Sequence, residues 1–328
     1  MKIGLTYDLK DYYLEKGFSE EETAEFDSNE TIEGIENALH LLGYKCDRIG
    51  HLENLMSRIL NNESWDLIFN IAEGMYGFAR EAQIPAILDA YRIPYTFSDP
   101  MVLSICLHKS ITKRLIRDLG LPTPDFYVIE NEEDLNKVNL PFPLFVKPIS
   151  EGTGKGINTS SVITNKIDLI DQTIYLLNQY NQPVLIETFL PGREFTVGIL
   201  GTSNNAKIVG VMEVIFEKSA EKDIYSFSNK KNYENRISYK LTDDPIAQKT
   251  ADIALKAWRG LNCRDAGRVD LRIDKNGVPN FIEMNPLAGL HPVHSDLPIL
   301  AKIAGMDYKT LIKEIIESAM SRLNRTSH

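Results

Sequence analysis

The stretch RVDLRI at residues 268–273 and the stretch FIEMNP at residues 281–286 flank the turn DKNG at residues 274–277. Apolar and polar residues alternate in the first stretch, which is typical of a strand with one buried face. An Asn-Gly pair between two such stretches indicates a β-hairpin. The returning strand is expected to bring Glu283 close to Asp270.

This hairpin carries oxygen ligands at neighbouring positions. Hard divalent cations prefer carboxylate and carbonyl oxygens and are completed by water and substrate phosphates. Asp270, Glu283 and Asn285 are therefore interpreted as a Mg-ATP site. The alternative is that the two acids are only solvated, or paired with Arg268 and Arg272.

A glycine-rich segment lies further towards the N-terminus. The apolar stretch FPLFVKP at residues 142–148 delivers Lys147 and is followed by SEGTGKG at residues 150–156. Glycines allow backbone N–H groups to approach phosphate oxygens closely. The spacing matches neither a Walker loop nor a dinucleotide-binding loop. A flexible surface turn is the alternative for this segment on its own.

A third segment, VLIETFLPGREFTV, spans residues 184–197. It reads as an apolar strand, a Pro-Gly turn and a second strand, with carboxylates at Glu187 and Glu194. Such a hinge can offer backbone groups to an adenine edge and an acid to ribose hydroxyls.

In this order, the three segments resemble the ATP-grasp superfamily and, within it, the D-alanine–D-alanine ligase family. Two further matches support the resemblance: IPYTFS at residues 93–98 with the pair at 108–109 looks like the family's PYTGS strand and DK pair, and residues 288–289 resemble the end of its NTSPG segment. The similarity runs over about residues 95–311, most of the chain.

The resemblance implies the fold. It predicts an α/β protein with a small parallel-sheet domain at 1–100, a central ATP-grasp subdomain at 101–183 and a C-terminal ATP-grasp subdomain at 184–328. The expected strands of the first domain are at 2–5, 44–49, 67–71 and 94–96, and the expected helices of the chain include 29–42, 109–119 and 308–323.

The resemblance also implies the ligands. Lys109 and Lys147 would hold ATP phosphates, and the hairpin ligands would bind two Mg²⁺ ions, with Mn²⁺ as a substitute. The other implied nucleotide contacts are Gly152, Thr153, Gly154 and Gly156 in the phosphate loop, Glu187, Thr188, Phe189 and Leu190 around adenine, and Glu194 at the ribose.

The family activates a carboxylate as an acyl phosphate, which an amine then attacks to form an amide. In this resemblance Arg268 neutralises charge on the transferred phosphoryl group. Residues 216–240 are expected to form a lid, in which YSFSNK at 225–230 resembles the family's YDYEAK element and makes Lys230 a phosphate-binding candidate. A charged loop whose lysines are only solvated is the alternative.

Departures from the family pattern concentrate on the substrate side. Thr153 and Gly154 replace two serines of the family loop, Lys231 replaces a tyrosine, and Glu73 replaces a histidine. These changes alter the charges that face the substrates, so we expect poor joining of two D-alanines and a larger or more polar substrate.

Contacts to the amino-acid substrates are less sharply indicated. Gly289 precedes a segment in which His294 or Ser295 would hold the second substrate's carboxylate. Zinc at His291 and His294 is disfavoured because no cysteine is near. Glu25 lies near the register of the family glutamate that orients the first substrate's amine, and the alternative is a solvated helix face.

Composition is that of a soluble cytoplasmic enzyme. The chain has 328 residues, a net charge of -10 and three cysteines without paired spacing. No nucleic-acid surface and no membrane span are expected, and the resemblance implies a homodimer. The leading function is an ATP-dependent carboxylate–amine ligase acting on small amino-acid or amine substrates. An ATP-grasp phosphotransferase and a catalytically inactive nucleotide-binding protein are the alternatives.

Overall fold

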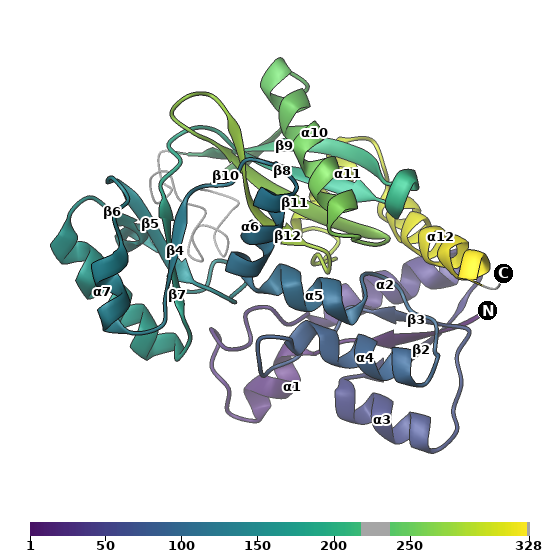
Figure 1. Ribbon diagram of the computed structural model, residues 1–328. Helices are drawn as coiled ribbons and strands as arrows, with labels where there is room; N and C mark the ends of the chain where they lie inside the picture. Colours follow the sequence, from purple (N-terminus) through teal and green to yellow (C-terminus); the bar gives the residue numbers. More distant parts are fainter. Residues whose placement is uncertain (218–236, 327–328) are drawn as a thin grey trace.

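The computed structural model describes residues 1–217 and 237–326. The chain begins with a parallel sheet in the order β2-β1-β3, which lies at the lower right of Figure 1. Its strands are β1 (Lys2–Thr6), β2 (Lys45–Gly50) and β3 (Leu67–Asn70). The predicted strand at 94–96 is reduced to one parallel bridge between Tyr95 and Ile68, because the neighbouring residues leave the ladder.

Helices cover both faces of this sheet because its strands alternate apolar side chains between two clusters. Leu5 and Phe69 pack with α2, whereas Ile68 packs with α3 and α4. The helices here are α1 (Lys10–Glu15), α2 (Asn29–Leu41), α3 (Leu52–Leu60), α4 (Gln83–Ala90) and the short 3-10 turn Arg80–Ala82. The Ser28 hydroxyl caps α2 by accepting from the Thr31 N–H.

The middle of the chain forms an antiparallel sheet in the order β4-β7-β5-β6, with α7 beside it (Figure 1). Helices α5 (Pro100–Leu107) and α6 (Lys109–Asp118) lead into it. Its elements are β4 (Phe126–Ile129), β5 (Leu144–Pro148), β6 (Val162–Ile163), α7 (Lys166–Tyr180), β7 (Val184–Thr188) and the 3-10 turns Glu132–Lys137 and Thr159–Ser161. Because β7 pairs with β4 and β5, this sheet extends past the predicted boundary at 183.

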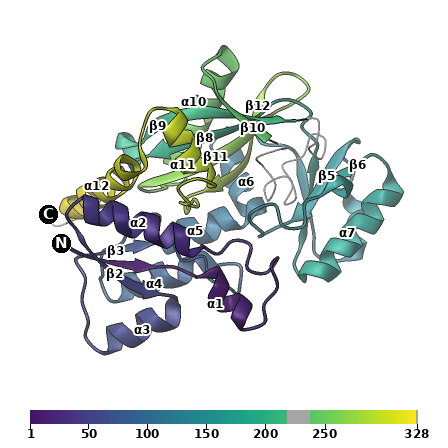
Figure 2. The same ribbon diagram turned by 180° about the vertical axis from the view of Figure 1, so that it is seen from behind.

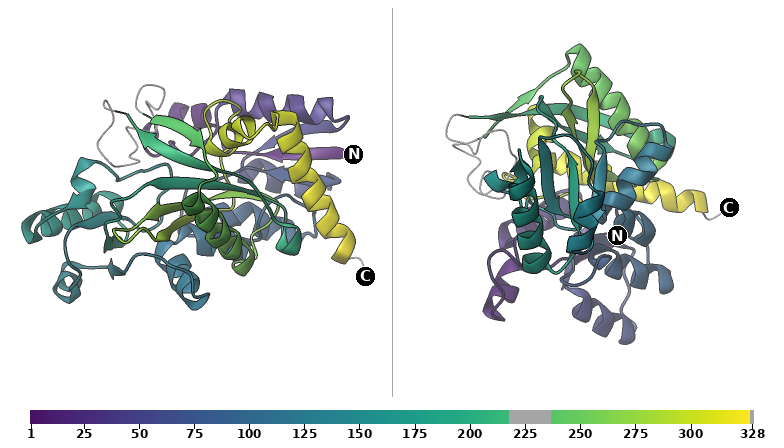
Figure 3. Two further views of the ribbon diagram at one scale, coloured as in Figure 1. Left: turned by 90° about the horizontal axis from the view of Figure 1, so that it is seen from above. Right: turned by 60° about the vertical axis from the view of Figure 1, so that its left-hand side comes forward.

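The C-terminal sheet is antiparallel in the order β10-β9-β8-β11-β12. Helix α10 packs on one face and α11 packs on the other (Figure 3). Leu300 of α11 approaches Gly198 so closely that an added Cβ would lie 2.7 Å from it. The elements are β8 (Glu194–Leu200), the 3-10 turn Ser203–Asn205, β9 (Lys207–Phe216), β10 (Ile237–Leu241), α10 (Pro245–Gly260), β11 (Ala266–Ile273), β12 (Pro279–Asn285), α11 (Asp296–Ile303) and α12 (Tyr308–Thr326).

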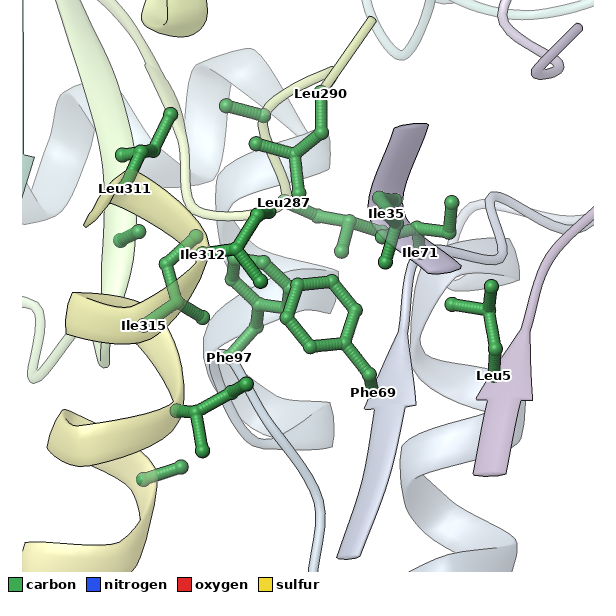
Figure 4. Packing of buried hydrophobic residues seen from close by; sticks show 14 of the residues in the cluster. Leu5, Ile35, Phe69, Ile71, Phe97, Leu287, Leu290, Leu311, Ile312 and Ile315 are labelled. Atoms are coloured by element: carbon green, nitrogen blue, oxygen red, sulfur yellow. The ribbon is translucent and has the colours of Figure 1, made fainter. Parts of the chain in front are cut away.

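The last helix joins the two ends of the chain. Figure 2 shows α12 beside α2, and its residues Ile312 and Ile315 share a buried cluster with Phe69 and Phe97 (Figure 4). This apolar contact fixes the N-terminal sheet to the C-terminal sheet. Across residues 1–217 and 237–326, no helix is both long and apolar enough to cross a membrane.

Candidate active site

The predicted hairpin is present, with its polar side chains in register. Asp270 pairs with Glu283, and Arg268 pairs with Asn285, across β11 and β12. The Asn285 amide donates to Asp270 Oδ2 at 3.2 Å, and the Thr196 hydroxyl donates to Asp270 Oδ1 at 2.8 Å. Arg268 also forms an ion pair with Asp270. The predicted metal ligands therefore lie together, and the pairing of an acid with Arg268 that the alternative interpretation expected is present as well.

The second arginine of the hairpin serves another acid. Arg272 Nη1 lies 3.1 Å from Glu194 Oε2, which holds the predicted ribose acid beside the strand. Arg272 also lies opposite Glu194 in the register of β11 and β8.

Lys109 lies between the hairpin and the phosphate loop. Its Nζ donates to the Glu151 carbonyl at 2.5 Å and lies 3.7 Å from Glu283 Oε2. Burial lowers the pKa of Lys109, and the charge of Glu283 partly offsets this. The first residue of α6 therefore places an ammonium group beside the predicted metal ligands.

A second buried lysine is held by an acid that the sequence had placed near adenine. Lys147 Nζ lies 2.7 Å from Glu187 Oε1, and Lys113 Nζ lies 2.9 Å from Glu187 Oε2. Burial opposes the charge of Glu187, but the two lysines outweigh it and hold its pKa below the usual range. Burial also lowers the pKa of Lys113 to about 8. The Glu187 carboxylate is thus a counter-ion for lysines.

Most of the predicted nucleotide residues line one cavity between the middle and C-terminal sheets, but Gly152, Thr153 and Gly156 are not part of this lining. The rings of Phe145 and Phe189 stack across part of its wall, with centroids 6.5 Å apart. The N–H groups of Thr188 and Phe189 already donate to the carbonyls of Asp125 and Pro143. The lining residues are Lys109, Phe145, Lys147, Glu151, Gly154, Ile157, Glu187, Thr188, Phe189, Leu190, Glu194, Asp270, Arg272, Ile282 and Glu283.

A second cavity, of about 290 Å³, adjoins the first and shares Lys109, Glu151 and Glu283 with it. Its walls come from both sheets of the ATP-grasp part and from the N-terminal domain. The predicted substrate and catalytic residues in its lining are Glu25, Glu73, Arg268, Gly289, His294 and Ser295, and Gly152 and Thr153 of the predicted phosphate loop line it as well. Residues that are distant in the sequence therefore meet around one cavity.

Glu25 is buried in an ion-pair network, so the alternative of a solvated helix face is wrong. Its carboxylate lies 2.8 Å from Arg80 and 3.1 Å from Lys155, and it accepts the Gly152 N–H at 2.7 Å. Although burial opposes ionisation, these groups lower the pKa of Glu25 to about 2. The segment forms turns instead of a helix, which directs this acid inward.

The histidine segment is held by local contacts. Ser295 Oγ accepts the His291 N–H at 2.9 Å, and the His291 ring lies 4.5 Å from the His294 ring. His291 Nε2 also lies 3.0 Å from Glu30. In the described part of the chain, no group of three or more histidine, cysteine or acidic residues is arranged to hold a metal. These contacts give no support to zinc at this position.

Two predictions fall on residues beyond the description. Lys230 and Lys231 lie between residues 217 and 237, outside the described residues. The lid therefore stays a prediction for residues 218–236, whereas the two ends of the predicted range 216–240 lie in strands, Phe216 in β9 and residues 237–240 in β10.

Three charged residues of the site had no role assigned from the sequence. Lys113 lies four residues after Lys109 on α6, so helical periodicity was a usable signal for a second inward lysine. Arg80 and Glu81 are set by contacts that are distant in sequence, such as the bond from Arg80 to the Ser150 carbonyl at 2.9 Å, and no local pattern marks them.

Known proteins share both the sequence pattern and the architecture. The family described as D-ala D-ala ligase C-terminus matches residues 115–317. The D-alanine–D-alanine ligase of Aquifex aeolicus is 32% identical over 88% of this chain and 94% of its own length. The chain belongs to the D-alanine–D-alanine ligase family.

Further members and a solved structure agree. The D-alanine–D-alanine ligase of Bordetella avium is 31% identical over 80% of this chain and 81% of its own length. The crystal structure of the Bacillus anthracis D-alanine–D-alanine ligase complexed with ATP superposes with a TM-score of 0.75 at 24% identity and covers 100% of both chains. The predicted family, the ATP-grasp fold and the ATP-dependent ligase class are confirmed.

Proposed function

We propose that this family member joins the carboxylate of one amino acid to the amine of a second small substrate through an acyl phosphate. The observation that carries the proposal is the junction of the two cavities, where Lys109, Glu151 and Glu283 line both. A γ-phosphate at this junction is within reach of a carboxylate in the second cavity. The transfer then occurs where the two cavities meet, and exclusion of water there would protect an acyl phosphate from hydrolysis.

The chemistry follows from the charges at the junction. A carboxylate oxygen attacks the γ-phosphorus and ADP departs; the amine nitrogen then attacks the acyl carbon, loses a proton and displaces phosphate. Lys109 and Lys147 neutralise phosphate charge, and Arg268 stabilises the charge that develops during transfer. Preorganised cations in a water-poor site supply most of this stabilisation.

The donor set of the hairpin fits a divalent cation. Two carboxylates and an amide oxygen lie next to one another at Asp270, Glu283 and Asn285, which are the ligand types that Mg²⁺ prefers. These three residues would hold Mg²⁺, and Mn²⁺ as a substitute, in this family member. When bound, the ion supplies positive charge against the phosphate oxygens.

We infer that D-alanine is a poor partner for itself here. Support comes from Glu73, which lines the second cavity where the family has a histidine. An added acid in a desolvated pocket favours a substrate that can pair with it. Turnover on D-alanine alone is expected to fall below about 1 per second, the low end of ordinary enzymes.

The test is a screen of amino acids of both chiralities, singly and in pairs, for phosphate release and product mass. Carboxyl groups labelled with ¹⁸O are expected to pass one labelled oxygen to phosphate, because the acyl phosphate bond breaks at carbon. A phosphorylated small molecule without free phosphate would instead establish the phosphotransferase. ATP binding without any turnover would establish the inactive alternative.

A further inference from the structure

The second cavity is lined by more acids than the described residues of the chain hold in ion pairs. Glu25 is paired with Arg80, Glu151 is paired with Lys155, and Glu283 faces Lys109. Three further acids line the same volume: Asp27, Glu73 and Glu81. These three ion pairs therefore leave three acids of the lining without a counter-ion among the described residues, and Arg268 of the same lining is bonded to Asp270.

Glu73 and Glu81 are two of these three acids. Within residues 1–217 and 237–326, neither carboxyl makes a hydrogen bond or an ion pair. Burial raises the pKa of Glu81 to about 7, and burial together with the charge of Glu81 raises the pKa of Glu73 well above its usual range. Burial also raises the pKa of the neighbouring Asp27 to about 7. All three acids would ionise more readily beside a cation.

The two cations near these acids, Arg80 and Lys109, are bonded to other groups. The Arg80 guanidinium donates one hydrogen bond to Glu25 at 2.8 Å and another to the Ser150 carbonyl at 2.9 Å. Lys109 is held by the Glu151 carbonyl at 2.5 Å. Each is fixed by a nearer partner, so neither can move to the two free carboxyls without breaking a buried contact.

A second observation in the same cavity points to a ligand. The Thr153 hydroxyl is buried without a hydrogen-bond partner in the described part of the chain, and Thr153 forms part of the cavity wall. Buried polar groups are costly unless they are satisfied. An unsatisfied hydroxyl in the same cavity lining as the two unpaired carboxyls indicates that a polar molecule completes this cavity.

We propose that one substrate carries a second ammonium group, which binds between Glu73 and Glu81. This assignment deepens the ligase function proposed above and rests on it. The attacking amine must be unprotonated to act as a nucleophile, so it does not pair with these acids. The α-ammonium of the substrate that supplies the carboxylate can balance only one of the two carboxyls, which leaves the other for a second ammonium group on a side chain. A diamino acid, such as ornithine, has this chemistry.

Glu25 does not fill this role in the structure. Its carboxylate already receives Arg80, Lys155 and the Gly152 N–H. A substrate ammonium at Glu25 would have to displace one of these contacts, whereas at Glu73 and Glu81 it displaces only protons. The cation site is therefore assigned to the two unpaired acids.

The first measurement compares two amino acids that differ only in a terminal ammonium group. Ornithine and norvaline have the same three side-chain carbons, but only in ornithine does the third carbon carry an ammonium group. Each enantiomer is supplied with ATP, Mg²⁺ and a panel of second amino acids, and kcat/KM is measured from phosphate release. We expect ornithine to be favoured over norvaline by at least about tenfold, equal to about 1.4 kcal/mol.

Two variants locate the preference. Glu73→Gln and Glu81→Gln keep the shape of each side chain and remove its charge, so each is expected to reduce the ornithine-to-norvaline ratio at least about fivefold. The matched control is Glu33→Gln, which removes an exposed acid on α2 and should leave the ratio unchanged. Circular dichroism and affinity for a non-hydrolysable ATP analogue establish that each variant is folded.

Calorimetry separates this proposal from the ligase function. With the ATP analogue and Mg²⁺ bound, ornithine should bind more tightly than norvaline and release protons at pH 7, measured in two buffers of different ionisation enthalpy. A binding preference for ornithine without turnover would support the cation site while refuting the ligase. Turnover with no preference for ornithine, or a preference that survives both substitutions, would overturn the cation site and leave the ligase standing. Binding of Mg²⁺ alone at the two acids, lost in both variants, would also overturn it.

Discussion

Lys147 Nζ lies 2.7 Å from Glu187 Oε1, and each side chain is only 3% exposed. The strand end that carries Lys147 is thus locked by a buried counter-ion from the neighbouring strand β7. A fixed ammonium group binds phosphate with little loss of side-chain entropy.

Lys147→Ala is therefore expected to weaken binding of a non-hydrolysable ATP analogue more than Lys155→Ala does. Lys155 is already engaged by Glu25 at 3.1 Å and Glu151 at 2.5 Å, so its ammonium contributes to the loop more than to the nucleotide. Isothermal titration of both variants measures the difference. Equal affinities would contradict this assignment.

Removing Glu187 is expected to destabilise the fold. Glu187→Ala leaves the buried ammonium groups of Lys113 and Lys147 facing each other without their shared partner, which costs about 3–5 kcal/mol. The control is Glu314→Ala, which breaks a surface pair with Lys207 and costs about 1 kcal/mol or less. Urea unfolding compares the two, and a similar loss in both variants would disprove the role of Glu187.

Glu283→Gln is expected to abolish ADP formation while the protein stays folded. Glu283 pairs with Asp270 across the hairpin and faces Lys109, so the substitution removes charge where phosphate is transferred, at a cost of about 3 kcal/mol or more in the transition state. Asn285→Ala should have a smaller effect. Steady-state ADP release measures both, and activity of Glu283→Gln within tenfold of the parent would refute the site.

Glu81→Gln is expected to stabilise the protein at pH 8 more than at pH 5. Burial raises the pKa of Glu81 to about 7, so between its ordinary pKa and pH 7 the folded state binds more protons than the unfolded state, and stability falls as pH rises through this window. The amide removes this loss. Urea midpoints at both pH values test it, and an equal gain at pH 5 and pH 8 would exclude the titration of Glu81.

Features set by local sequence were predictable. The alternation and the Asn-Gly turn placed Asp270 opposite Glu283, as the strand register confirms. Family motifs placed Lys109 and Lys147 beside the nucleotide cavity, although their exact ligand contacts stay predictions, as do the homodimer and the cytoplasmic location.

Features set by tertiary contacts were not predictable. Glu25 reads as one acid among several in its segment, and only Arg80 and Lys155, which are 55 and 130 positions away in the chain, make it a buried anion. Likewise, the side chain of Glu187 turns to Lys113 because α6 packs beside the middle sheet. The sequence around Glu25 and around Glu187 does not include these partners, so local patterns could not indicate the ion pairs.

Arg80 joins parts of the molecule that handle different reactants. It holds Glu25 of the N-terminal domain and the carbonyl of Ser150 at the start of the phosphate loop, while Glu25 itself holds Gly152. Movement of the loop onto a nucleotide must therefore shift the wall of the amino-acid cavity. By thermodynamic reciprocity, a nucleotide that tightens amino-acid binding is itself bound more tightly, by the same factor, once the amino acid is in place.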